Sequence, residues 1–247
     1  MTKRVALVTG GMGGIGTAVC KRFASLEYSV VANYLPGYAR KDQWLAGMRA
    51  DGFGEVVAID ADVTSLESCQ AMSRRIEAEV GSVDILVNCA GITRDATFRK
   101  MGVDEWMAVI NSNLNATYNV TKQVIDGMAM RGWGRVISLS SVNGTRGQFG
   151  QTNYSAAKAG IAGFSRALAQ EVVKKGVTVN CVSPGYVETD MVRAIRPDVL
   201  AGIVDSIPIG RLARPEEIAA LVAFLASDEA AYITGANIPI NGGMHMS

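Results

Sequence analysis

Tyr154 and Lys158 are the pair whose residue types and spacing point most directly to chemistry. They lie four residues apart in a segment, residues 153–175, that has helical periodicity, so their side chains are expected on one face of a helix. A phenol has a pKa of about 10, and a nearby ammonium lowers that pKa by favouring the phenolate. We therefore expect Lys158 to lower the pKa of Tyr154 and make it an acid and base near neutral pH.

Ser141 and Asn113 are the two further candidates for this chemistry. Ser141 follows a predicted strand at residues 135–138 and precedes Tyr154 by thirteen positions, so its hydroxyl could hold a carbonyl oxygen beside the phenol. Asn113 lies inside a predicted helix at residues 104–129, where asparagine is unfavourable unless its side chain bonds something. It could anchor a water relay to Lys158, or it could satisfy backbone groups at a kink.

A glycine-rich turn after the first predicted strand, residues 5–8, predicts an anion site. Glycines here permit a tight turn and place a pyrophosphate at the N-terminus of the following helix, where free N–H groups and the helix dipole favour it. The alternative is a turn without a ligand, but a strand before it and a helix after it favour binding. The residues expected to contact a dinucleotide here are Gly10, Met12, Gly13, Gly14, Ile15 and Gly16.

The end of the second predicted strand, residues 29–32, indicates which dinucleotide would bind. An acid about 20 residues beyond the glycine turn normally holds the ribose 2'-hydroxyl of NAD. Here the strand runs into Asn33 and Tyr34, and the first acid is Asp42. Arg40 and Lys41 could instead neutralise a 2'-phosphate, which favours NADP; the alternative is that both are merely solvated charges at a helix start.

Two more strand ends are expected at the same edge of the sheet. Asp62 and Val63 follow the third strand, where Asp62 could accept a hydrogen bond from an adenine amino group. Asn88, Cys89, Ala90 and Gly91 follow the fourth, where small residues would let a cofactor ribose approach the backbone. Each could equally be an ordinary strand-to-helix turn.

Short runs rich in Val and Ile alternate with longer helical segments along the whole chain. This alternation predicts a single-domain α/β fold, Rossmann-like and doubly wound, with about seven parallel strands and helices on both faces. The other predicted strands are 56–59, 85–87, 177–180 and 237–240, and the other predicted helices are 15–26, 41–50, 65–79 and 215–226. Residues 186–211 interrupt the pattern, and we expect an irregular substrate lid there within one domain spanning 1–247.

Composition narrows the class of protein. The 24 Lys and Arg residues balance 23 Asp and Glu residues, so no basic field favours nucleic acid. His245 is the single histidine and the four cysteines are scattered, which argues against a histidine triad, a metal site and a disulfide framework. The longest apolar stretch, residues 218–226, is less than half a membrane span, so we expect a cytoplasmic protein without a membrane partner.

Three sets of residues occur in a familiar order and spacing: the glycine turn, the run from Asn88 to Gly91, and Asn113 with Ser141, Tyr154 and Lys158. This order and spacing is that of the short-chain dehydrogenase/reductase family, which the sequence resembles over essentially its whole length. The resemblance implies an NADP-dependent oxidoreductase in which Tyr154 and Lys158 also contact the cofactor, and it implies a homotetramer. Thr189 would contact the nicotinamide carboxamide. Cys89 departs from the asparagine usual in the family. Further cofactor contacts implied by the resemblance are Pro184, Gly185 and Val187.

Within that family the sequence is most similar to acetoacetyl-CoA reductases of polyhydroxybutyrate synthesis, on stretches such as residues 91–95, 119–128 and 147–154. That similarity implies reduction of acetoacetyl-CoA by NADPH. The alternatives are a 3-oxoacyl-[acyl-carrier-protein] (ACP) reductase of fatty-acid synthesis, which shares the chemical residues, and a non-enzymatic NADP-binding module. The residues implied to contact the acyl thioester, beside Ser141, are Asp95, Gln148, Phe149, Gln151, Tyr186 and Arg196.

Overall fold

The computed structural model describes residues 3–246, so residues 1, 2 and 247 of the predicted domain lie outside the described part. The strands are β1 (Val5–Val8), β2 (Ser29–Tyr34), β3 (Val57–Asp60), β4 (Val83–Asn88), β5 (Gly134–Leu139), β6 (Val177–Pro184) and β7 (Asn237–Ile240). The longer helices are α1 (Gly14–Ser25), α2 (Lys41–Ala50), α3 (Leu66–Glu79), α4 (Val103–Ile110), α5 (Ala116–Arg131), α7 (Thr152–Val172), α9 (Pro197–Asp205) and α10 (Pro215–Ala226).

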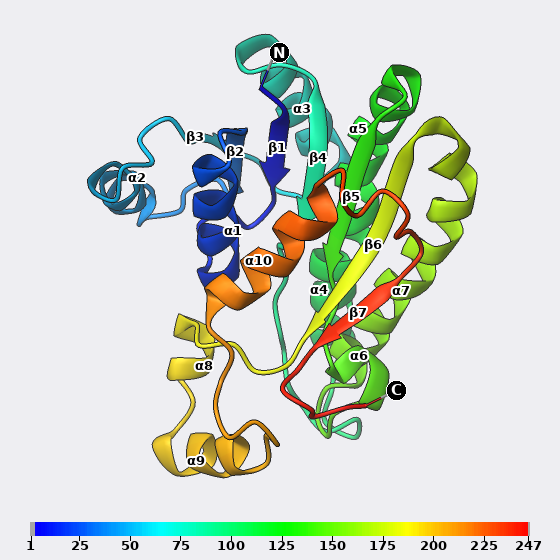
Figure 1. Cartoon of the computed structure of the whole chain (residues 1–247). Coiled ribbons are helices and arrows are strands. Elements are labelled where there is room, and N and C mark those ends of the chain that lie inside the picture. The colour runs from blue at the N-terminus through cyan, green and yellow to red at the C-terminus, as the bar shows by residue number, and fades with distance from the viewer. Residues whose placement is uncertain (1–2, 247) are drawn as a thin grey trace.

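The strands form one parallel sheet in the order β3-β2-β1-β4-β5-β6-β7. The chain winds outward from β1 in one direction and, after crossing to β4, outward in the other (Figure 1). In open α/β sheets of this kind, ligands bind beyond the carboxyl ends of the strands where the winding reverses. The loops after β1 and β4 meet at that point.

Two apolar cores hold the sheet between layers of helices. Ala6 and Val8 of β1 pack with residues of α1 and α10 on one face, whereas Val5 and Leu7 pack with residues of α3, α5 and α7 on the other. This alternation follows from the two-residue period of a strand, and burial of both faces explains why strands such as β1 are continuous apolar runs. The predicted Rossmann-like α/β class is confirmed.

The predicted elements occur, with two differences that bear on the site. The predicted helix 104–129 is divided by a π-helical turn, η1 (Asn111–Asn115), between α4 and α5. The expected irregular segment 186–211 is wrong in detail, because it contains α8 (Asp190–Arg193) and α9. Pro197 stands in the first turn of α9, where a backbone N–H has no acceptor within the helix, so the proline costs no helical hydrogen bond.

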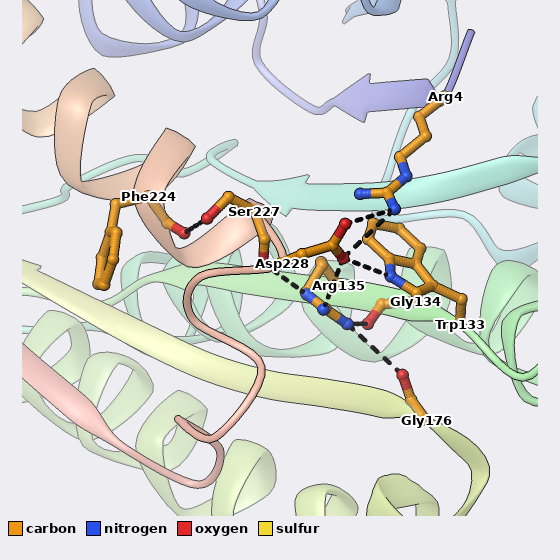
Figure 2. A network of polar contacts seen from close by, with 8 residues as sticks. All are labelled: Arg4, Trp133, Gly134, Arg135, Gly176, Phe224, Ser227 and Asp228. Atoms are coloured by element: carbon orange, nitrogen blue, oxygen red, sulfur yellow. Dashed lines mark hydrogen bonds and ion pairs between the residues drawn. The ribbon is translucent and has the colours of Figure 1, made fainter. Parts of the chain in front are cut away.

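A polar network closes the amino-terminal end of the sheet, opposite the glycine turn (Figure 2). The Arg135 guanidinium, only 3% exposed, donates to the carbonyl oxygens of Gly134, Ser227 and Gly176 and to Asp228. Trp133 lies between two cations, with the guanidinium carbons of Arg4 and Arg135 at 3.7 and 4.4 Å from its ring centre. The network joins the starts of β1, β5 and β6 to the end of α10.

Replacing Arg135 by methionine is expected to lower the free energy of unfolding by about 3 kcal/mol, since buried carbonyls lose their donor. Urea denaturation at one fixed protein concentration measures the change. Arg4→Met is the matched control, because Arg4 is partly exposed and its ion pair and ring contact contribute about 1 kcal/mol. Equal losses in the two variants would contradict the importance assigned to the buried guanidinium.

Candidate active site

A cavity of about 620 Å³ opens at the carboxyl ends of the strands, where the winding of the sheet reverses. It is lined by the glycine turn, by the loops after β2, β4, β5 and β6, and by α7 and α8. Of the predicted cofactor residues, it brings together Gly10, Met12, Gly13, Gly14, Ile15, Gly16, Arg40, Cys89, Ala90, Gly91, Tyr154, Lys158, Pro184, Gly185, Val187 and Thr189.

The glycine turn has the form that a pyrophosphate requires. Gly10 has φ +61°, and a Cβ there would lie 2.9 Å from the Ala90 Cα. A Cβ on Gly16 would collide with the Gly10 carbonyl oxygen, so the turn can close only with glycine at both positions. The first turn of α1 has neither a side-chain cap nor an acidic residue, which leaves its N–H groups and dipole available to an anion. These residues fit a dinucleotide phosphate.

Tyr154, Lys158 and Ser141 face the same cavity. The helix α7 places Tyr154 and Lys158 one turn apart, with the Lys158 Nζ 5.5 Å from the centre of the Tyr154 ring. The Lys158 ammonium is buried and donates to the Leu139 carbonyl oxygen at 2.7 Å. The Ser141 Oγ accepts the Asn143 N–H and also hydrogen-bonds to Tyr154. A carbonyl oxygen beside Tyr154 would therefore meet two hydroxyl groups.

The expectation that Tyr154 has a lowered pKa, near neutrality, is wrong for the protein alone. Burial raises the pKa of Tyr154 to about 12, and the hydrogen bond from Ser141 offsets only part of that rise. Burial also lowers the pKa of the Lys158 ammonium to about 8. Tyr154 consequently holds its proton at neutral pH, which is the form required of a proton donor.

Asn113 sits in the π-helical turn η1 and is fully buried. Its Nδ2 donates to the carbonyl oxygens of Val109, at 2.8 Å, and Ile92, at 3.0 Å, so the side chain satisfies backbone groups around the turn. The Asn113 Oδ1 has no hydrogen-bond partner within the described chain. This oxygen lies beside Gly91, and the Lys158 Nζ is a further neighbour of the same glycine. A π-turn of this kind is frequent at functional sites. The turn thus leaves an acceptor free next to the cavity.

Arg40 lies at the far end of the cavity from Tyr154. Its guanidinium stands 3.4 Å from the Asp190 carboxylate at the start of α8 and 5.7 Å from the centre of the Tyr38 ring. No acidic side chain follows β2 before Asp42, and Lys41 pairs with Asp42 instead of lining the cavity. Arg40 is therefore the cation that the structure offers to an anionic group at this end.

Some predicted contacts are not part of the cavity lining. Asp62 accepts the N–H and the hydroxyl of Thr64, and the Asn88 amide donates to Thr121 and Ser138 within the fold. The substrate residues Asp95, Gln151 and Tyr186 do line the cavity. The predicted residues outside the lining are Asp62, Val63, Asn88, Gln148, Phe149 and Arg196, and their roles stay predictions.

The sequence patterns missed several lining residues. Tyr34 ends β2, and Leu35 and Tyr38 follow it, so the shared edge of the parallel strands was a signal that could have found them. Asn143 stands two positions after Ser141, but nothing local marks it as part of the site. Three further lining residues that were not predicted come from the segment 186–211: Asp190, Val192 and Ile195.

Residues 3–246 contain neither a metal-binding cluster nor a membrane-spanning helix. No three His, Cys, Asp or Glu side chains in that range gather as a metal site would require. No helix of the described chain is long and apolar enough to cross a membrane.

A doubly wound parallel sheet, with a tyrosine, a lysine and a serine in one cavity with the glycine turn, is the arrangement typical of dinucleotide-dependent enzymes. Residues 10–245 match a family model described as enoyl-(acyl carrier protein) reductase. The chain belongs to the short-chain dehydrogenase/reductase family, whose enzymes are oxidoreductases that use nicotinamide cofactors.

Curated relatives cover the full length of the chain. It is 57% identical over 246 residues to an acetoacetyl-CoA reductase of Cupriavidus necator, with 100% of each chain covered. It is 57% identical to an acetoacetyl-CoA reductase of Allochromatium vinosum, covering 98% of this chain and 99% of the relative. A 3-oxoacyl-[acyl-carrier-protein] reductase of Pseudomonas aeruginosa is 46% identical, covering 99% of this chain and 98% of the relative.

Proposed function

We propose that the protein reduces a 3-oxoacyl thioester with NADPH, converting acetoacetyl-CoA to (R)-3-hydroxybutyryl-CoA. The observation that carries this proposal is the presence of Ser141, Tyr154 and Lys158 in one cavity with the glycine turn. The identity of 57% to acetoacetyl-CoA reductases, against 46% to the ACP-linked relative, supports the choice of carrier. Arg40 and the lack of an acid after β2 support NADPH over NADH.

In the proposed reaction a reduced nicotinamide held by the glycine turn and Lys158 would supply the hydride that C3 of the substrate takes up. Tyr154 transfers its phenolic proton to the C3 oxygen, and the Ser141 hydroxyl holds that oxygen in place. The Lys158 ammonium, 5.5 Å from the phenol ring, stabilises the phenolate that is left and holds the cofactor ribose. The Asn113 side chain, with its free acceptor, continues the proton path to water.

The glycine turn would hold the pyrophosphate, and the main chain from Cys89 to Gly91 the adjoining ribose. Thr189 stands against Gly14, close enough that a Cβ on this glycine would meet its side chain at 2.7 Å. This position suits the proposed contact of Thr189 with the carboxamide. We also propose that residues 186–211 form a substrate lid, that four copies assemble, and that the enzyme works in the cytoplasm.

Comparing NADPH oxidation with acetoacetyl-CoA and with acetoacetyl-ACP tests the proposal. We expect a higher kcat/KM with acetoacetyl-CoA. A preference for the ACP substrate would favour the alternative, which draws support from three exposed cations near the cavity, Arg94, Arg99 and Lys100. Failure to oxidise NADPH with either thioester or with simple ketones would favour a non-enzymatic binding module.

Replacing Arg40 by glutamine is expected to raise the KM for NADPH by about 10- to 100-fold, as expected when a charged hydrogen bond to the 2'-phosphate is lost. The KM for NADH should change little, since NADH has no phosphate there. Lys41→Gln is the matched control, because Lys41 pairs with Asp42 outside the cavity. Parallel changes in the two KM values of Arg40→Gln would refute the selectivity assigned to Arg40.

A further inference from the structure

Four side chains at the substrate end of the cavity form one hydrogen-bonded chain, called here the mouth relay. The Gln151 Nε2 donates to the Asp95 carboxylate at 2.9 Å, and the Asn143 Nδ2 donates to the Gln151 Oε1 at 3.0 Å. The Arg146 Nε donates to the Asn143 Oδ1 at 3.3 Å. Asp95, Gln151 and Asn143 line the cavity, so the relay borders the space beside Tyr154.

The direction of the mouth relay is set by its two ends. The Asp95 carboxylate only accepts hydrogen bonds, and the Arg146 guanidinium only donates them. Between them, each amide has one orientation that satisfies both neighbours. The Gln151 amide therefore turns its NH2 group toward Asp95. Of the two N–H groups on Nε2, one meets Asp95 and the other has no acceptor among residues 3–246.

Asn143 ties this relay to the proposed proton donor. Its backbone N–H donates to the Ser141 Oγ at 3.2 Å, and its side chain is buried. The next residue, Gly144, packs directly on α7, since a Cβ there would lie 2.9 Å from backbone and side-chain atoms of Lys158. Asn143 is thus held against both Ser141 and Gln151, and it cannot move away without disturbing α7.

We propose that Asn143, held by Arg146, is a positioning residue that directs the free N–H of Gln151 to the thioester carbonyl of the substrate. The inference rests on the proposed function, because it needs a substrate with a second carbonyl near the one that is reduced. The mouth relay then favours a 3-oxoacyl thioester over a simple ketone, because the thioester carbonyl accepts a hydrogen bond from the Gln151 N–H and a simple ketone has no second carbonyl to do so. Ser141 and Tyr154 act on the other carbonyl.

Asn143→Asp tests the relay with an isosteric change that replaces the amide donor by an acceptor. The carboxylate cannot donate to the Gln151 Oε1, and a turned amide would set that oxygen against the Asp95 carboxylate. Neither orientation then satisfies both neighbours, so the free N–H of Gln151 loses its fixed direction. The KM for acetoacetyl-CoA is expected to rise by about 10-fold while kcat falls by less than about 3-fold, the effect of one lost hydrogen bond to the substrate. NADPH affinity, measured by fluorescence titration, should stay near the wild-type value.

A double variant separates positioning from a merely structural role. With Asp95→Asn and Asn143→Asp together, Asn at position 95 donates to Gln151 and Asp at position 143 accepts from it. Both hydrogen bonds of the Gln151 amide are thus remade in the reverse direction, while Arg146 still donates to position 143. Thermal stability should then recover to that of Asp95→Asn alone. The KM should stay about 10-fold above that of Asp95→Asn, because the Gln151 amide is now held with its oxygen, and not its N–H, toward the substrate.

The outcomes decide between the two proposals. Recovery of KM in the double variant, or an unchanged KM in Asn143→Asp, would overturn the positioning role and leave the proposed function intact. If the wild-type protein does not reduce acetoacetyl-CoA, both the positioning role of Asn143 and the proposed function are refuted. If Asn143→Asp does not fold, Arg146→Met is used instead, because it removes the donor at the exposed end of the mouth relay. An unchanged KM for acetoacetyl-CoA in Arg146→Met would also overturn the positioning role of Asn143.

Discussion

Tyr154→Phe is expected to lower kcat by about 10²- to 10⁴-fold, the range for losing a positioned proton donor. The phenol is the group that would protonate the C3 oxygen, and burial, which raises its pKa to about 12, keeps it protonated at neutral pH. Phenylalanine keeps the ring that packs beside the Lys158 ammonium but has no proton to give. NADPH affinity should therefore survive the change.

Steady-state NADPH oxidation measures the loss, and fluorescence titration measures cofactor binding. Tyr232→Phe is the matched control, because the Tyr232 side chain is fully exposed and outside the cavity. Turnover by Tyr154→Phe at a rate near that of Tyr232→Phe would refute the proposed role of the phenol.

Lys158→Met has the second largest expected effect, a fall in kcat/KM of about 10²- to 10³-fold, typical of losing a preorganised charge at a reacting group. The ammonium would stabilise the Tyr154 phenolate and hold the cofactor ribose, so NADPH affinity should also fall. In the wild-type protein that affinity should weaken as pH rises through about 8, where Lys158 loses its proton.

Protein stability gives an independent test of the same group. Burial lowers the pKa of Lys158 from 10.5 to about 8, so between these values the unfolded chain binds more protons than the native protein. The penalty for the buried charge is full below pH 8, and the free energy of unfolding rises with pH from about 8 to 10.5. Lys158→Met should lack this rise. Parallel stability curves for the two proteins would contradict a buried, charged Lys158.

Local sequence patterns were sufficient to predict the glycine turn, the shared helical face of Tyr154 and Lys158, and the parallel sheet. The glycines from Gly10 to Gly16 imply a tight turn at a helix start, because only residues without a Cβ allow that approach of the chain. Four-residue spacing places Tyr154 and Lys158 on one helical face whatever surrounds the helix. Apolar runs of strand length predict the parallel sheet, and the meeting of the strand ends at one edge follows from it.

Other properties depend on which distant segments the fold brings together. The pKa of Tyr154 rises because burial outweighs its polar neighbours, and burial depends on the packing of the whole domain. Arg40 meets Asp190, which lies 150 positions away, and Asp95 meets Gln151 across 56 positions. The Asn113 side chain in the π-turn donates to the carbonyl oxygen of Ile92, which lies 21 positions away.

The sequence alone determined the fold class, the glycine turn and the placing of Tyr154 and Lys158 on one helical face, because each follows from a pattern of residues near in the chain. Only the tertiary structure decided the protonation of Tyr154, the direction of the mouth relay and the residues that line the substrate end. These depend on burial and on hydrogen bonds between side chains far apart in sequence, and such contacts leave no local pattern.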